Sequence, residues 1–442
     1  MTATSHLARD TSLGGVIRTM SALLLGVSVL SMGSGAMLAV IGVRLSSAGA
    51  STMMIGAVMS AFFLGELIGS MYGGRVIGRV GHIRAFAVFA AIGAVATLML
   101  ALIDSLPVWT LLRFVAGYCI AGLSMIAESW LNHRATNATR GRTLSVYIIA
   151  VSAAFALGPL ALNLADPNGN ELIVAVGILF VLALLPVALT RTGNPEIGEQ
   201  RRLSLRRLFA IAPMGVLGAL TVGLVESTFF GLGAVYGASI GLSPALVSVF
   251  LSVSLGGLLV MQFPIGALSD RFDRERVILV ITLIAGAAAL AVAVIGTMSF
   301  ALLLALTFVM GGLSSPLYPL ALAEANDYLE TDELVPAAGA ILLAYSMGAT
   351  AGPLAASALM ALVGPAGLYG FIAVVLFAFG IYAAHRVRQG LAKPVDQQTE
   401  FQPAMSHATP LAAGLDPRGP EDPAYDTSWE REESEDDGKG WS

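Results

Sequence analysis

The chain has 442 residues, of which 56% are hydrophobic and only 12% are charged, and its mean hydropathy is +0.80. Soluble globular domains carry about 25% charged residues, so this composition excludes a soluble protein and indicates a chain that lies largely within a lipid bilayer. The net charge of −5 conceals two parts: the residues before Gln389 hold twenty bases and seventeen acids, and those from Gln389 onward hold four bases and twelve acids.

After a short N-terminal segment, 1–17, twelve apolar runs follow one another, each close to the ~20 residues that cross ~30 Å of hydrocarbon. The first six lie at 18–43, 52–73, 83–103, 108–131, 144–164 and 172–189. A basic connector, 191–208, leads to six more at 209–236, 245–268, 277–297, 300–323, 337–363 and 368–384. These runs predict an all-α membrane protein with twelve transmembrane helices in two six-helix bundles, 18–190 and 209–388. The polar, acidic segment 389–442 is expected to be a disordered cytoplasmic tail.

The arginines give the orientation of these spans. With twelve spans both termini lie on one side, and eighteen of the twenty arginines before Gln389 fall on that side, all except Arg44 and Arg113. Because basic residues gather in cytoplasmic loops, we expect both termini in the cytoplasm. The protein itself is expected in the inner (plasma) membrane of the cell.

The two predicted bundles repeat each other. Residues 74–84, after the second span, match residues 266–276, after the eighth, at a constant offset of 192. The run Gly158-Pro159 in the fifth span matches Gly352-Pro353 in the eleventh, and each proline interrupts a helical hydrogen bond, so we expect kinks at both places. A duplicated six-helix unit places a cavity between the halves, near the middle of the membrane.

The segment 266–276 contains a glycine, an aspartate-arginine pair and further basic residues, and it resembles the loop signature of the major facilitator superfamily. The resemblance implies a secondary transporter with the fold of that family, in which this loop holds the cytoplasmic side closed during alternating access. The residues to which it gives this gating role are Gly266, Asp270, Arg271, Arg274 and Arg276. We expect Asp270 to accept hydrogen bonds from a neighbouring helix N-terminus, and the arginines to lie at the anionic membrane surface.

The first-half copy departs from this signature. It retains Gly74, Arg79 and Arg84, but Gly78 stands where Asp270 stands in the second half, and a glycine cannot accept that hydrogen bond. A second closure is suggested by the loops that follow spans four and ten. We hypothesise that the basic loop pairs with the acidic loop when the protein faces outward, the residues being Arg134, Arg140 and Arg142 on one side and Glu324, Asp327, Glu330, Asp332 and Glu333 on the other.

Ionisable residues inside spans are costly, at roughly 2.5–3.5 kcal/mol, and usually face a cavity or a partner. Glu66 and Glu226 are therefore the candidates for carrying protons, with Arg113 acting on one of them; structural pairing is the alternative. An arginine near the start of span four, followed by Gly117, also resembles a family feature tied to proton coupling. We interpret Glu128, close to Trp130, as an interfacial anchor.

Glycines at every fourth position, Gly65, Gly69 and Gly73, predict close packing of the second span. Gly158-Pro159 resembles part of the fifth-span signature of proton-coupled drug exporters, so the resemblance favours export.

The sequence favours one function over a second. The single cysteine, Cys119, excludes an intrachain disulfide. The histidines do not have the spacing of metal ligands, and the sequence contains no phosphate-binding glycine-lysine loop. We therefore expect no metal, no cofactor and no enzymatic activity. We predict a monomeric, proton-coupled transporter of a small organic solute with no nucleic-acid partner. The alternative is a receptor or scaffold that has this fold and transports nothing.

Overall fold

The computed structural model describes residues 13–135, 139–183, 203–330, 333–390, 393–406, 409 and 411–412. The first half contains α1 (Leu13–Ser47), α2 (Thr52–Val80), α3 (His82–Leu102), α4 (Leu106–Arg134), α5 (Arg140–Leu157), the 3-10 helix η1 (Gly158–Asn163) and α6 (Glu171–Leu182). The second contains α8 (Leu205–Ile211), α9 (Pro213–Ser239), α10 (Pro244–Arg271), α11 (Arg274–Ile295), η2 (Gly296–Met298), α12 (Phe300–Ser314), α13 (Leu317–Asn326), α14 (Leu334–Val363) and α15 (Gly367–Gln389).

Within the described residues, eleven helical segments are long and apolar enough to cross a membrane. Three of them are composite, since α5 continues into η1, α11 into η2 and α12 into α13. The predicted span 172–189 corresponds to α6, a shorter apolar helix of 12 residues, and its remaining residues lie outside the described part. The segment predicted as a connector up to residue 208 already contains the start of α8, which Ser204 caps by accepting from the backbone N–H of Arg207.

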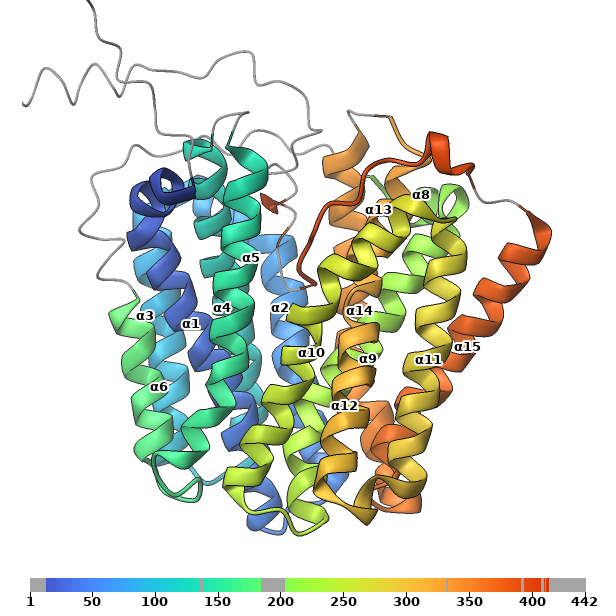
Figure 1. Cartoon of the computed structure of the whole chain (residues 1–442). Helices are drawn as coiled ribbons and strands as arrows, with labels where there is room; N and C mark the ends of the chain where they lie inside the picture. Colours follow the sequence, from blue (N-terminus) through green and yellow to red (C-terminus); the bar gives the residue numbers. More distant parts are fainter. Residues whose placement is uncertain are drawn as a thin grey trace, which may run out of the picture.

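The duplication extends to local structure and packing. Ser51 and Ser243, 192 residues apart, cap α2 and α10 by accepting hydrogen bonds from the third helical residue, Met54 and Leu246. In the first half α2 packs on α4 and α1 on α5, and in the second half α10 packs on α12 and α9 on α14. Figure 1 shows the two bundles side by side, α1–α6 in blue to green and α9–α15 in green to red.

Glycines set the closest of these contacts. A Cβ atom on Gly158 would lie 2.5 Å from the backbone nitrogen of Ala36 in α1, and one on Gly352 would lie 2.5 Å from Ser227 Oγ in α9. The glycine of each Gly-Pro pair therefore permits a close approach to α1 in the first half and to α9 in the second. The helical pattern changes to 3-10 at Gly158, whereas α14 continues as an α-helix through Pro353. The predicted glycine ladder of α2 lies against α4, where Gly69 approaches the carbonyl oxygen of Tyr118.

The two halves meet at one end of the molecule. We call the end at which α1 begins and α15 ends the terminal end; it is uppermost in Figure 1. At the other end, Asn163 Nδ2 donates to Ser248 Oγ at 2.9 Å and Ser252 Oγ donates to the carbonyl of Ala156 at 2.8 Å, each bond joining the halves. Toward the terminal end the bundles separate, and the last residues of the segment 393–406 enter the space between them (Figure 1).

The prediction of disorder from residue 389 onward is therefore wrong for the first part of that segment. The structure describes residues 393–406, which include a 3-10 turn at Val395–Gln397. Only Asp396 and Glu400 of the twelve acids occur before residue 412, and this stretch also contains the apolar side chains of Phe401, Met405 and Leu411. The acidic composition of the whole tail concealed a short apolar part that packs against the bundles.

Candidate functional site

A cavity lies between the two halves, at mid-length of the helices. The carboxylates of Glu66 on α2 and Glu226 on α9 both line it, together with Gln262 and many apolar side chains, including Phe62, Phe155 and Phe230. Two predicted proton carriers from opposite halves therefore face one space. The rest of the lining is mainly aliphatic and aromatic, which suits the apolar part of a small organic solute.

Glu226 is only 6% exposed and is surrounded by hydroxyl groups. Its carboxylate accepts hydrogen bonds from Tyr345 Oη at 3.2 Å, from Ser406 Oγ at 2.7 Å and from the Ser315 side chain. Among the described residues no cationic side chain forms an ion pair with it. The described contacts therefore do not support the alternative for Glu226, in which the carboxylate would serve only as the partner of a structural ion pair.

Glu66 and Arg113 are brought together where α2 crosses α4. A Cβ atom on Gly117 would lie 3.1 Å from the backbone nitrogen of Glu66, so the two helices are in backbone contact there. Arg113 is 2% exposed, and its guanidinium carbon lies 4.2 Å from the centroid of the Phe62 ring. Since Phe62 lines the cavity and Arg113 does not, the arginine lies behind that ring, near enough to Glu66 for the two charges to interact.

The interpretation of Glu128 as an interfacial anchor is wrong. Its carboxylate is fully buried, accepting from Tyr147 Oη at 2.9 Å and from both the backbone N–H, at 2.9 Å, and the hydroxyl of Thr409. Trp130 is buried as well and stacks on Phe86. No sequence pattern predicts this environment, because the partner Thr409 is 281 residues away along the chain.

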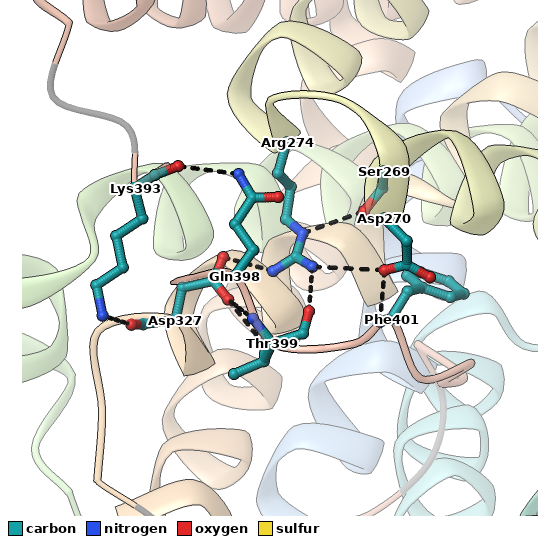
Figure 2. A network of polar contacts seen from close by, with 8 residues as sticks. All are labelled: Ser269, Asp270, Arg274, Asp327, Lys393, Gln398, Thr399 and Phe401. Carbon is teal, nitrogen blue, oxygen red and sulfur yellow. Dashed lines mark hydrogen bonds and ion pairs between the residues drawn. The ribbon is translucent and has the colours of Figure 1, made fainter. Parts of the chain in front are cut away.

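The loop between α10 and α11 forms a network with the tail, shown in Figure 2. Asp270 Oδ1 accepts from the backbone N–H of Phe401 at 2.8 Å, where a neighbouring helix N-terminus was expected. Arg274 is 1% exposed and does not face a membrane surface: it pairs with Asp327 at 2.5 Å and donates to Ser269 Oγ at 3.1 Å. The same guanidinium donates to the carbonyl of Thr399 at 2.5 Å.

The remaining residues of this loop have simpler surroundings. Arg271 is exposed, and Arg276 is exposed and pairs at 3.4 Å with Asp273, whose carboxylate caps α11. Gly266 lies directly beneath the ring of Phe401, which a Cβ atom would overlap. Four of the five residues that the resemblance singled out thus have described contacts, and three of them (Gly266, Asp270 and Arg274) contact the tail.

Within the part of the chain that the structure describes, the copy of this loop in the first half forms no such network. Gly78 faces open space, and the side chains of Arg79 and Arg84 are exposed. Gly74 meets only the sulfur of Met125, at 3.6 Å from a Cβ atom placed there. His82 stands at the position equivalent to Arg274 and hydrogen-bonds Ser129 within the same half. The asymmetry expected from Gly78 is therefore larger than one residue.

The acidic loop after α13 pairs within its own half. Asp327 binds Arg274, and Glu333 binds Arg207 at 2.6 Å. Asp332 and the side chain of Arg134 lie outside the described part of the chain. The hypothesis that this loop pairs with the basic loop concerns the outward-facing state and stays a prediction.

Two solved transporters have the same architecture as this chain. The nucleoside transporter NupG, as its D323A mutant, superposes with a TM-score of 0.69 at 14% identity, covering 82% of this chain and 99% of that one. A bacterial homologue of the human lysosomal transporter Spinster, in an inward-facing and occupied conformation, gives 0.65 at 17% identity, covering 88% and 98%. At these identities the likeness defines the fold class, two six-helix bundles around a central cavity.

Sequence relatives give the family. The model described as Major Facilitator Superfamily matches residues 23–236 and 215–413. An uncharacterized MFS-type transporter of Yersinia pestis (strain Pestoides F) is 30% identical over 358 residues, covering 79% of this chain and 89% of the relative. The uncharacterized MFS-type transporter YcaD of Salmonella enteritidis PT4 is 28% identical over 345 residues, covering 78% and 89%. The chain belongs to the major facilitator superfamily, a family of membrane transporters and not an enzyme class, and it is a multi-pass protein of the bacterial inner membrane.

Proposed function

We propose that the protein transports a small organic solute by alternating access and couples this movement to protons. The observation that carries the proposal is the placing of Glu66 and Glu226, from opposite halves, on one central cavity. Each carboxylate changes its charge when it takes up a proton. If the halves rock about the cavity, the same carboxylates meet water first from one side of the membrane and then from the other, which is what coupling requires.

The proposed roles of the three buried ionisable residues differ. Glu226, held by hydroxyl groups alone, is the main proton carrier. Glu66 binds the solute or a second proton, and Arg113, which lies behind the Phe62 ring, adjusts the proton affinity of Glu66. We place both termini in the cytoplasm, as the arginine distribution predicts, and we propose export as the direction, on the partial likeness of the fifth span to drug exporters.

The test begins with a thermal-shift screen of organic solutes on the purified protein, which identifies a ligand without assuming transport. Flux of that ligand is then measured in proteoliposomes with pH gradients of both directions. We expect the gradient to drive accumulation in the wild type. In Glu226→Gln, gradient-driven accumulation should fall to the level of protein-free liposomes while ligand exchange across equal concentrations persists, because the amide retains the cavity but carries no exchangeable charge.

Glu171→Gln is the matched control, since Glu171 is an exposed carboxylate at the start of α6 and does not line the cavity. It should transport like the wild type. Unchanged gradient response in both Glu226→Gln and Glu66→Gln would refute proton coupling through these residues. A ligand that binds but never crosses would favour the receptor instead.

A further inference from the structure

Part of the C-terminal tail lies between the two bundles. We call residues 393–406, with Thr409, Leu411 and Ala412, the C-terminal strap. The strap is not a loose extension, because Thr409 is 5% and Ala412 7% exposed, and most of residues 399–406 are half-buried. It contacts both halves of the transporter.

On the second half the strap is held by the loop network of Figure 2. Asp327 accepts from the backbone N–H of Thr399 at 2.7 Å and from its hydroxyl at 2.8 Å. Lys393 Nζ donates to the backbone carbonyl of Asp327 and lies 5.4 Å from the centroid of the Tyr328 ring. Burial raises the pKa of Tyr328 to about 12, so the ring that faces this ammonium group is a neutral phenol.

On the first half the strap reaches α4 and α5. Met405 Sδ accepts from Ser152 Oγ at 3.6 Å, and Thr409 donates to Glu128 through both its backbone N–H and its hydroxyl. Asn132 Nδ2 donates to the carbonyl of Leu411. The strap thus bridges the two bundles at the end where they separate.

The strap also divides the space between the halves. Ala404, Met405 and Ser406 line the inner cavity that contains Glu66 and Glu226. A second cavity lies toward the terminal end, near Leu144 at the start of α5 and Asn326 at the end of α13, and Gln402, Pro403, Ala404, Met405, Thr409 and Ala412 form one wall of it. Ala404 and Met405 belong to both cavities, so the strap lies between the inner cavity and the opening at the terminal end.

We propose that the C-terminal strap is an autoinhibitory plug, a tethered occupant that competes with the solute for the cavity and holds the terminal end open at a fixed width. Ser406 donates to Glu226 Oε2, the carboxylate assigned above to coupling, so the strap occupies the same acceptor that transport uses. The halves cannot close at this end while the chain lies between them. Each transport cycle therefore requires the strap to leave. That the inner cavity is the transport site rests on the function proposed above; the plugging itself does not.

Access to the inner cavity tests the plug without any solute. Ser124 lines that cavity and lies one helical turn, about 6 Å, deeper on α4 than Glu128, which holds Thr409. In a Cys119→Ala background, Ser124→Cys is labelled in detergent with a charged maleimide, in the full chain and in a chain that ends at residue 392. We expect labelling about tenfold faster or more in the shortened chain, because the plug no longer shields the thiol.

Two further variants guard against a shortened chain that fails to fold. The triple substitution Thr399→Ala, Ser406→Ala and Thr409→Ala removes strap hydroxyl donors and leaves the bundles intact, and it should also speed labelling. Gly78→Cys, at an exposed position facing open space, should be labelled equally fast with and without the strap. Equal rates for Ser124→Cys in the full chain, the triple variant and the shortened chain would overturn the proposal.

A lock tests the consequence for transport. In the same background, Ser152→Cys with Met405→Cys replaces a contact of 3.6 Å between α5 and the strap. Oxidation to the disulfide should abolish flux of the ligand identified in the thermal-shift screen, and a reductant should restore it. In Met405→Cys alone, neither the oxidant nor the reductant should change the flux. Undiminished flux in fully cross-linked protein would refute the plug. If no variant transports anything, the proposed function fails, and the labelling rates still decide whether the strap closes the cavity.

Discussion

The positions of Glu66 and Arg113 depend on two glycines that have no charge and no direct part in the chemistry. Gly65 on α2 lies against the carbonyl of Phe114, and Gly117 on α4 lies against the carbonyl of Phe62. Because neither has a Cβ atom, the two backbones touch, which places Glu66, next to Gly65, on the cavity wall and Arg113 behind the Phe62 ring. In lipid, where apolar surface alone drives little association, such contacts are a principal source of helix packing.

We predict that Gly65→Ala pushes α2 and α4 apart. The added methyl group would meet backbone atoms of Phe114 and Tyr118 rather than a flexible side chain, so the helices themselves must move, at a cost of ~1–3 kcal/mol. The measurement is the unfolding temperature of the purified protein, which should fall, together with gradient-driven flux, which should decrease. Gly78→Ala adds the same methyl group in open space and serves as the control; equal melting of the two variants would contradict the prediction.

At the residue scale, the sequence was informative where a charge interrupts an apolar run. Glu66, Arg113 and Glu226 could be selected on that basis, and the structure places them on or directly behind the cavity wall. Glu128 satisfied the same criterion but lies near the end of its span, a position that also suits an interfacial residue. Its true partner belongs to the tail, and no local pattern encodes a contact over 281 residues.

At the scale of elements, the two copies of one loop have diverged in what they contact. The loop from α10 to α11 binds the strap through Asp270 and Arg274, whereas the loop from α2 to α3 has Gly78 and His82 at these positions and exposed arginines. The duplication could be read from the offset of 192 residues, because repeated helix ends need repeated turns. The contact of the second copy with the strap could not be predicted from the sequence, because the strap belongs to a tail whose overall composition is acidic.

The difference between the copies predicts different outcomes for the same substitution. Gly266→Ala introduces a methyl group that overlaps the Phe401 ring, so the strap should be displaced and Ser124→Cys labelled several-fold faster. Gly74→Ala, at the equivalent position of the first half, brings a methyl group to within only 3.6 Å of Met125 Sδ, an ordinary contact, and should leave the labelling rate unchanged. Slow labelling in both variants would show that the ring yields without releasing the strap.

For the whole molecule, hydropathy predicts the positions of the long apolar helices, but not which end of the molecule is closed. Closure is a property of one conformation, and a sequence that supports alternating access must permit both. Among the described residues, hydrogen bonds join the two halves at the end away from the strap, including those of Asn163 with Ser248 and of Ser252 with Ala156. These contacts are the ones that must break when the molecule opens the other way.

This requirement gives a prediction about the rocking motion itself. A short thiol cross-linker between Asn163→Cys and Ser248→Cys, in a Cys119→Ala background, should hold the halves together at that end and stop flux, because their native side chains lie 2.9 Å apart only while it is closed. Arg44→Cys with Asn170→Cys is the control, since Arg44 Nη1 and Asn170 Oδ1 lie 3.0 Å apart within the first half. That pair should cross-link without loss of flux, because a half that moves as a rigid body does not change its internal distances. Transport that continues through the inter-half cross-link would mean that this end does not open in the cycle, and alternating access by rocking of the two halves would have to be abandoned.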